Sequence, residues 1–168
     1  MKSIILISLF VIWPFSQTYS QRILMEKINF IIVLNEDINP IINSIKIKIV
    51  TKTKDTINYK AKYIPGSLEI DKKFFDDLKK LNIKTIILEI SYTNKNNYNH
   101  SHCKIKGVRT WWFKSYYFIL YIYDKKVKKY RRLFNFSKNN DCVYEYDTPN
   151  GISMKLARKK HIFFGIWY

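Results

Sequence analysis

The stretch "SIKIKIVTKT" (Ser44–Thr53) decides the fold class of this chain of 168 residues. Ile45, Ile47 and Ile49 alternate with Lys46 and Lys48. Because successive side chains of a β-strand point to opposite faces, this period of two puts the isoleucines on a buried face and the lysines on a wet face. The stretch therefore predicts a strand at the surface of a β-rich domain.

Other segments repeat this signal. "KINFIIVLN" (Lys27–Asn35) is apolar on both faces, as a central strand is. "INYKAKY" (Ile57–Tyr63) and "KTIILEISYT" (Lys84–Thr93) alternate in the manner of the first stretch. Farther along, four more strands are expected, the first two joined as a hairpin through Asp124, Lys125 and Lys126: Thr110–Asp124, Lys125–Phe136, Cys142–Tyr146 and Ile152–Ala157.

One helix is predicted in "DKKFFDDLKKLN" (Asp71–Asn82). Asp71 is a favourable residue to cap the free amides at the start, and Lys79 and Lys80 suit the negative C-terminal end. Phe74, Phe75, Leu78 and Leu81 lie on one face of such a helix.

Many short strands and a single helix favour a mainly β fold, specifically an antiparallel β-sandwich of immunoglobulin- or transthyretin-like type. A parallel α/β fold would show repeated helices. One alternative is a small outer-membrane barrel, because "HIFFGIWY" (His161–Tyr168) alternates and ends in an aromatic residue, which resembles the terminal strand of such barrels. Most of the predicted strands are shorter than the ~9–11 residues that a barrel strand needs.

The N-terminal residues 1–20 have the pattern of a secretory signal peptide. Lys2 precedes an apolar run of twelve residues (Ile4–Phe15), and Thr18 and Ser20 are small residues at the expected cleavage site. Twelve helical residues cover roughly 18 Å, too little for a ~30 Å hydrocarbon core. We therefore expect residues 21–168 to form one exported β-rich domain, periplasmic or extracellular, with no transmembrane helix after cleavage.

The formal net charge is +17, from 30 lysines and arginines against 13 acidic residues. Such a charge favours polyanions such as an anionic envelope surface or an acidic polysaccharide. Alternatively, the positive charge has no function and follows from a biased base composition of the gene, since Ile, Lys and Asn dominate the chain while Ala is rare. A protein partner also stays open, and nucleic acid is not favoured.

Basic residues are most concentrated in "DKKVKKYRRLF" (Asp124–Phe134). If this segment is a strand, Lys126, Lys128, Tyr130 and Arg132 share one face, and charges occupy both faces. One interpretation is an edge strand whose lysines protect it against aggregation. The other is a strip of basic residues that binds polyanions. The residues of that hypothetical binding strip are Lys125, Lys126, Lys128, Lys129, Arg131 and Arg132, with Lys155, Arg158, Lys159 and Lys160 as additions if they lie nearby.

"YNHSHC" (Tyr98–Cys103) raises the possibility of a metal site, because His100, His102 and Cys103 are all potential ligands. Cys103 and Cys142 are the two cysteines of the chain, and in an exported protein they are expected to form a disulfide. His100 and His102 would then need His161 or Asp141 as a further metal ligand. We expect the loop to be a solvated one, with no metal or other cofactor.

No pattern of residues points to catalysis. There is no G-x-S-x-G elbow, and four glycines leave no phosphate-binding loop. Glu145 and Asp147 are a conceivable acid/base pair, although such a pairing is unremarkable at this density of acidic residues. Trp111, Trp112 and Tyr116 are conceivable stacking surfaces, but aromatic residues in so apolar a segment more often belong to the core. The sequence thus predicts a small exported binding module that is not an enzyme. The alternatives are a secreted toxin or effector, a metal-dependent enzyme, and a structural envelope component.

Overall fold

The computed structural model describes residues 24–95, 98–138 and 140–159. Within them the protein is mainly β, as predicted. The predicted signal peptide (residues 1–20), Lys160, His161 and the C-terminal stretch "HIFFGIWY" lie outside the described residues.

The described chain contains nine strands, two α-helices and one 3₁₀ helix. In chain order they are β1 (Met25–Leu34), β2 (Ile41–Thr51), β3 (Thr56–Ile64), β4 (Ser67–Asp71), α1 (Lys72–Lys80), β5 (Ile83–Thr93), β6 (His100–Val108), η1 (Thr110–Phe113), β7 (Phe118–Asp124), α2 (Lys128–Leu133), β8 (Cys142–Asp147) and β9 (Ser153–Met154).

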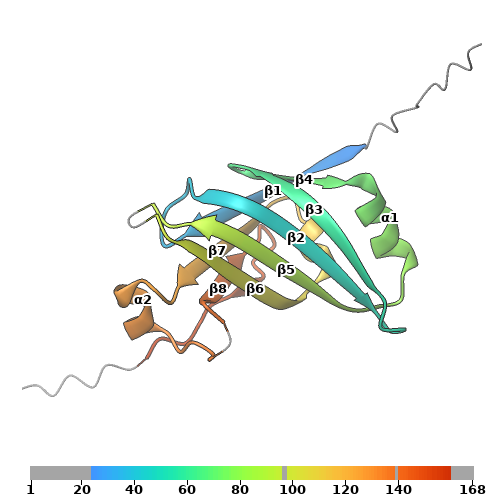
Figure 1. The fold of residues 1–168 in the computed structure, drawn as a ribbon. Coiled ribbons are helices and arrows are strands. Elements are labelled where there is room, and N and C mark those ends of the chain that lie inside the picture. Colours follow the sequence, from blue (N-terminus) through green and yellow to red (C-terminus); the bar gives the residue numbers. More distant parts are fainter. Residues whose placement is uncertain (1–23, 96–97, 139, 160–168) are drawn as a thin grey trace, which may run out of the picture.

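The strands form one mixed sheet in the order β6-β5-β2-β3-β4-β1-β7-β8-β9, curled into a half-barrel (Figure 1). β1 joins its two parts. Residues 25–29 pair with β4 in antiparallel fashion, whereas residues 30–34 pair with β7 in parallel. The sequence predicted an antiparallel β-sandwich, whereas the strands of the described chain form a single curled sheet in which β1 and β7 are parallel. Alternation within a strand carries no information on its direction relative to β7, which follows more than eighty residues later.

The concave side of the curl holds the hydrophobic core. This core contains the buried isoleucines of β2, which are those of the opening stretch, with buried side chains of the neighbouring strand β5 and of β1 and β7: Ile45, Ile47, Ile49, Leu88, Ile90, Phe30, Ile32, Phe118 and Leu120. The opposite side of β2 carries exposed Lys46 and half-buried Lys48. The alternation in Ser44–Thr53 thus predicted correctly which residues enter the core.

A second apolar layer covers the outer side of β7. The rings of Tyr130 and Phe134 are buried, and their centroids lie 5.0 and 4.8 Å from that of Tyr123. This layer corrects the prediction of a strand over Lys125–Phe136, which is instead a turn followed by the short helix α2. In a strand, Tyr130 and Phe134 would share their face with Lys128 and Arg132, whereas the helical turn keeps the two buried rings on one side and leaves Lys128 and Arg132 exposed.

The predicted strand Thr110–Asp124 also begins later than expected, at Phe118. Residues 110–113 form η1, in which Trp112 and Phe113 are both buried. Consecutive residues of a strand point to opposite faces, so a strand could not bring both rings into one core. The 3₁₀ turn does so, and it stacks Trp112 on Phe118 with ring centroids 4.4 Å apart.

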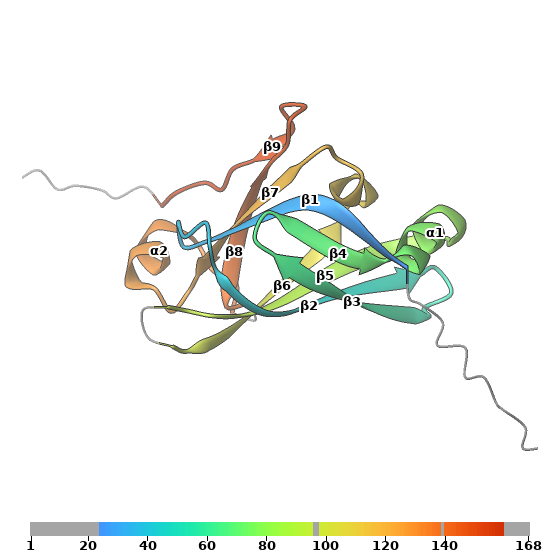
Figure 2. The ribbon, with the colours of Figure 1, turned by 90° about the horizontal axis from the view of Figure 1, so that it is seen from above.

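Helix α1 confirms the helix predicted in Asp71–Asn82. The Asp71 carboxylate accepts a hydrogen bond from the Lys73 backbone amide at 2.9 Å, and Phe74, Phe75 and Leu78 are buried. Viewed from above, α1 and α2 lie at opposite ends of the curled sheet (Figure 2). None of the helices in the described ranges has the length and apolar character needed to cross a membrane.

Candidate functional site

Cys103 and Cys142 form the predicted disulfide. Cys103 lies on β6 and Cys142 on β8, with their Cα atoms 5.3 Å apart, and both are buried. These two strands are not neighbours in the hydrogen-bonded order of the sheet. The disulfide therefore connects strands from the two ends of the curl, and it removes Cys103 from any set of metal ligands.

The histidines of "YNHSHC" are exposed on β6 and contact neutral side chains. His100 Nδ1 lies 3.0 Å from Thr93 Oγ1 and 3.2 Å from Asn43 Nδ2. His102 Nδ1 lies 3.2 Å from Ser91 Oγ. Across residues 24–95, 98–138 and 140–159, no three His, Cys, Asp or Glu residues converge in a way that could hold a metal ion. His161, the proposed third ligand, is outside these ranges.

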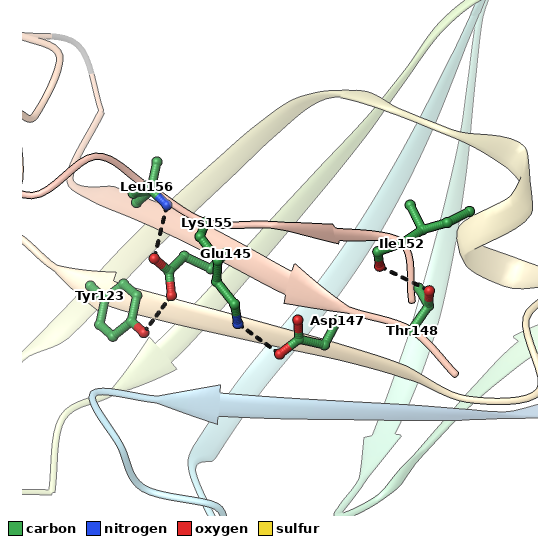
Figure 3. Close-up of polar contacts among 7 residues, drawn as sticks. All are labelled: Tyr123, Glu145, Asp147, Thr148, Ile152, Lys155 and Leu156. Atoms are coloured by element: carbon green, nitrogen blue, oxygen red, sulfur yellow. Dashed lines mark hydrogen bonds and ion pairs between the residues drawn. The ribbon is translucent and has the colours of Figure 1, made fainter. Parts of the chain in front are cut away.

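The carboxylates Glu145 and Asp147 of β8 are both occupied by neighbours (Figure 3). Glu145 accepts hydrogen bonds from the Tyr123 hydroxyl at 3.0 Å and from the Leu156 backbone amide at 2.9 Å. Asp147 pairs with Lys155 Nζ at 2.7 Å. Burial, together with the Glu145 carboxylate, raises the pKa of Tyr123 well above its ordinary value. The contacts of Glu145 with Leu156 and of Asp147 with Lys155 fasten the C-terminal segment to β8.

The basic residues of Asp124–Phe134 surround the outer side of α2. Lys128, Arg131 and Arg132 are exposed and have no ion-pair partner in the described ranges. Lys129 pairs with Glu36 at 2.7 Å, and Lys126 Nζ donates to the His100 backbone carbonyl at 2.9 Å. The arrangement leaves a charged surface with buried Tyr130 beneath it.

The C-terminal segment adds further basic residues to this surface. The Lys159 backbone amide donates to the Leu133 carbonyl at 2.8 Å, and Lys159 Nζ donates to the Arg131 carbonyl at 3.1 Å. Exposed Arg158 is adjacent in the chain. The combined group is called the α2 cluster below and consists of Lys125, Lys126, Lys128, Lys129, Arg131, Arg132, Arg158 and Lys159. Lys155, also considered from the sequence, is engaged with Asp147 instead.

The three aromatic residues considered as stacking surfaces differ in their exposure to solvent. Trp112 is 3% exposed and Trp111 is half-buried, and both pack on Tyr146 as part of the core. Tyr116 is 82% exposed. The structure therefore does not bring the three rings together as one flat ligand-binding surface.

A buried polar group that the sequence analysis did not identify lies beside the disulfide. Asp124 on β7 is fully buried; its Oδ1 accepts a hydrogen bond from the Lys126 backbone amide at 2.8 Å. Burial, together with the nearby Asp124 carboxylate, raises the pKa of the equally buried Tyr92 far above its ordinary value. Both residues are buried, Tyr92 on β5 and Asp124 on β7, and the Tyr92 hydroxyl makes no hydrogen bond within the described residues.

The outer face of β2, β3, β5 and β6 carries most of the remaining charge. Six lysines lie there against Glu89 of β5 and Glu69 of the adjacent strand β4: Lys46, Lys48, Lys60, Lys62, Lys104 and Lys106. Glu89 pairs with Lys48 at 2.9 Å and with Lys104 at 3.2 Å. Burial acts to raise the pKa of Glu89, but the hydrogen bonds from these two lysines outweigh it and lower the pKa overall.

Comparison with protein-family models, with curated proteins and with solved structures finds no match to this chain. Function must therefore be argued from the geometry described above.

Proposed function

We propose that this protein is an exported binding module that attaches to an anionic polysaccharide or envelope surface through the α2 cluster, without catalysing a reaction. The observation that carries the proposal is the docking of the C-terminal segment along α2 through the two hydrogen bonds of Lys159. It adds Arg158 and Lys159 to basic residues that lie more than twenty positions earlier in the chain. A concentrated positive field of this kind attracts polyanions and accelerates their association.

The composition of the surface favours attraction by charge over insertion into lipid. The large hydrophobic residues that are exposed in the described ranges, such as Ile38 and Tyr116, belong to other segments, and the apolar residues of α2 face inward. A partner that presents a dense row of negative charges therefore fits this surface. Export rests on the signal-like residues 1–20 and is supported by the disulfide, which is typical of oxidising compartments.

The test compares two triple variants that each remove three positive charges. The first variant replaces Lys128, Arg131 and Arg132 by Gln; the control replaces Lys72, Lys73 and Lys79 of α1, at the opposite end of the molecule, by Gln. Binding to immobilised heparin and to vesicles that contain anionic lipid is measured at increasing salt. A basic residue near an anionic membrane surface is worth about 1 kcal/mol, so three correspond to roughly a hundredfold in affinity at low salt.

We expect the α2 variant to lose most of its binding and the α1 variant to stay within a few-fold of the wild type. Equal losses in the two variants would mean that only net charge matters, and the α2 cluster would then have no specific role. Unchanged retention of the α2 variant would refute the proposal outright.

A further inference from the structure

Two histidines lie on the exposed face of β6 beside the α2 cluster. Residues 101, 103 and 105 of this strand are buried, whereas His100 and His102 alternate with them and are exposed. The contact with the α2 cluster is direct, because Lys126 Nζ donates a hydrogen bond to the His100 backbone carbonyl at 2.9 Å. Histidine is the side chain whose charge ordinarily changes between pH 5 and 8. The α2 cluster therefore has two groups at its border whose charge depends on pH.

Both imidazoles contact partners that tolerate either charge state. His102 Nδ1 lies 3.2 Å from Ser91 Oγ, and His100 Nδ1 lies 3.0 Å from Thr93 Oγ1. A hydroxyl donates to a neutral ring nitrogen and accepts from a protonated one, so it needs only to rotate when the ring gains a proton. His100 also contacts the side-chain amide of Asn43, at the β-bulge of β2, and an amide can present its oxygen to a protonated ring. Protonation therefore does not require these contacts to break.

The elements around the two rings carry more positive than negative groups. The carboxylates are Glu36 and Asp37 after β1, Glu89 on β5 and Asp141 before β8; the ammonium groups are Lys46 and Lys48 on β2, Lys95 after β5, Lys104 on β6, and Lys125, Lys126 and Lys129 around α2. Glu36, Asp37 and Glu89 each already pair with lysines. Neither histidine forms an ion pair within the described ranges, so a proton taken up by either ring adds a positive charge that no carboxylate offsets.

We propose that His100 and His102 make the α2 cluster a pH-sensitive surface, which binds polyanions more tightly as the pH falls through the range in which histidine gains its proton. This inference rests on the proposed function, because it concerns the regulation of the same surface. A basic residue near an anionic surface strengthens binding roughly fivefold at low salt, so two added charges correspond to roughly thirtyfold. Added salt weakens the effect, since it is electrostatic.

The test measures the affinity for heparin at about pH 8 and about pH 5.5, at one fixed low ionic strength. The sulfate groups of heparin stay ionised at both values, so the change in charge is on the protein. The wild type is compared with two double variants, His100→Gln with His102→Gln and His100→Arg with His102→Arg. A matched control, Asn58→Arg with Asn82→Arg, adds two charges at exposed positions on β3 and after α1.

We expect the wild type to bind roughly thirtyfold more tightly at the lower pH. The Gln variant should keep only the part of this change that other titrating groups supply, and the Arg variant should bind at the higher pH as tightly as the wild type does at the lower. Because protonation and binding are linked, calorimetry in buffers of different ionisation enthalpy should show proton uptake by the wild type at about pH 6.5 and less uptake by the Gln variant.

The same pH dependence in the wild type and the Gln variant would overturn this inference and leave the proposed function intact. A control variant that gains as much affinity at the higher pH as the Arg variant would also overturn it, because the position of the charges would then be irrelevant. If the wild type does not bind heparin at either pH, the proposed function itself is wrong, and the inference fails with it.

Discussion

Breaking the disulfide between Cys103 and Cys142 should weaken the fold strongly. The two cysteines are separated by 39 residues. In the chain-entropy model, a crosslink that closes a loop of this length stabilises the folded state by about 4 kcal/mol, because it restricts the unfolded chain. This corresponds to roughly a thousandfold change in the unfolding equilibrium and lowers the melting temperature by roughly 8–16 °C.

The structure gives a reason why other contacts do not replace this bond. β6 and β8 are not paired by a backbone ladder, and a bridging hydrogen bond runs from Asn140 Nδ2 to the Lys104 carbonyl at 3.2 Å, at an exposed position. An exposed bond of this kind is worth about 1 kcal/mol at most. The covalent link is therefore the strongest single contact between β6 and β8, which are otherwise held together by exposed side-chain hydrogen bonds and by packing in the core.

The measurement is a urea unfolding curve followed by tryptophan fluorescence, on oxidised protein and on protein that has been reduced while unfolded and then refolded in reductant. The double variant Cys103→Ala, Cys142→Ala is the control and should not respond to reductant. Asn140→Ala in the oxidised protein should change the unfolding free energy by less than about 1 kcal/mol. If reduction shifts the unfolding free energy by no more than Asn140→Ala does, the reasoning is wrong and the core alone maintains the curl.

The other predictions concern single polar groups. Glu89→Gln should cost about 1–2 kcal/mol at neutral pH, because it removes the charge that Lys48 and Lys104 bind. The pKa of Glu89 is lowered in the folded state, so this stabilisation is complete above the ordinary glutamate pKa of about 4.3. It is lost as the pH falls through the lowered folded-state pKa, and below that value the unfolding curves of wild type and variant should converge. The buried Tyr92 hydroxyl makes no hydrogen bond within the described residues, so Tyr92→Phe should leave the unfolding free energy unchanged or raise it by up to about 1 kcal/mol; a loss of more than about 1 kcal/mol in urea unfolding would show that the hydroxyl does stabilise the fold. Asp71→Ala should cost about 1 kcal/mol by removing the cap of α1, and Asp71→Asn should restore most of that loss in thermal unfolding.

Local patterns identified the strands and the core reliably where one face of a strand is buried. The alternation of isoleucine and lysine in β2 and the two apolar faces of β1 both correspond to what the structure shows. The same reading failed for α2, where the dense charges hid a helical spacing of Tyr130 and Phe134. A test of that segment for a period of 3.6 would have found the helix.

The candidate sites depended more on contacts between distant segments. Six of the eight residues of the α2 cluster were predicted from the sequence as one group, with Arg158 and Lys159 as additions if they lay nearby. The hydrogen bonds of Lys159 to α2 are what bring Arg158 and Lys159 to this cluster. The lysines of β2 and β3 had been read as the wet faces of strands. The structure agrees, since Lys46 and Lys60 lie directly opposite each other on the outer face of the sheet.

The sequence alone determined the mainly β class, helix α1, the disulfide and the positive charge, because each follows from residue types and short-range periodicity. Only the tertiary structure decided the parallel pairing of β1 with β7, the curl of the sheet, and the surfaces where lysines gather. The physical reason is that strand partners are chosen by burial across the whole domain, and the side-chain pattern within one strand is the same whichever partner it takes.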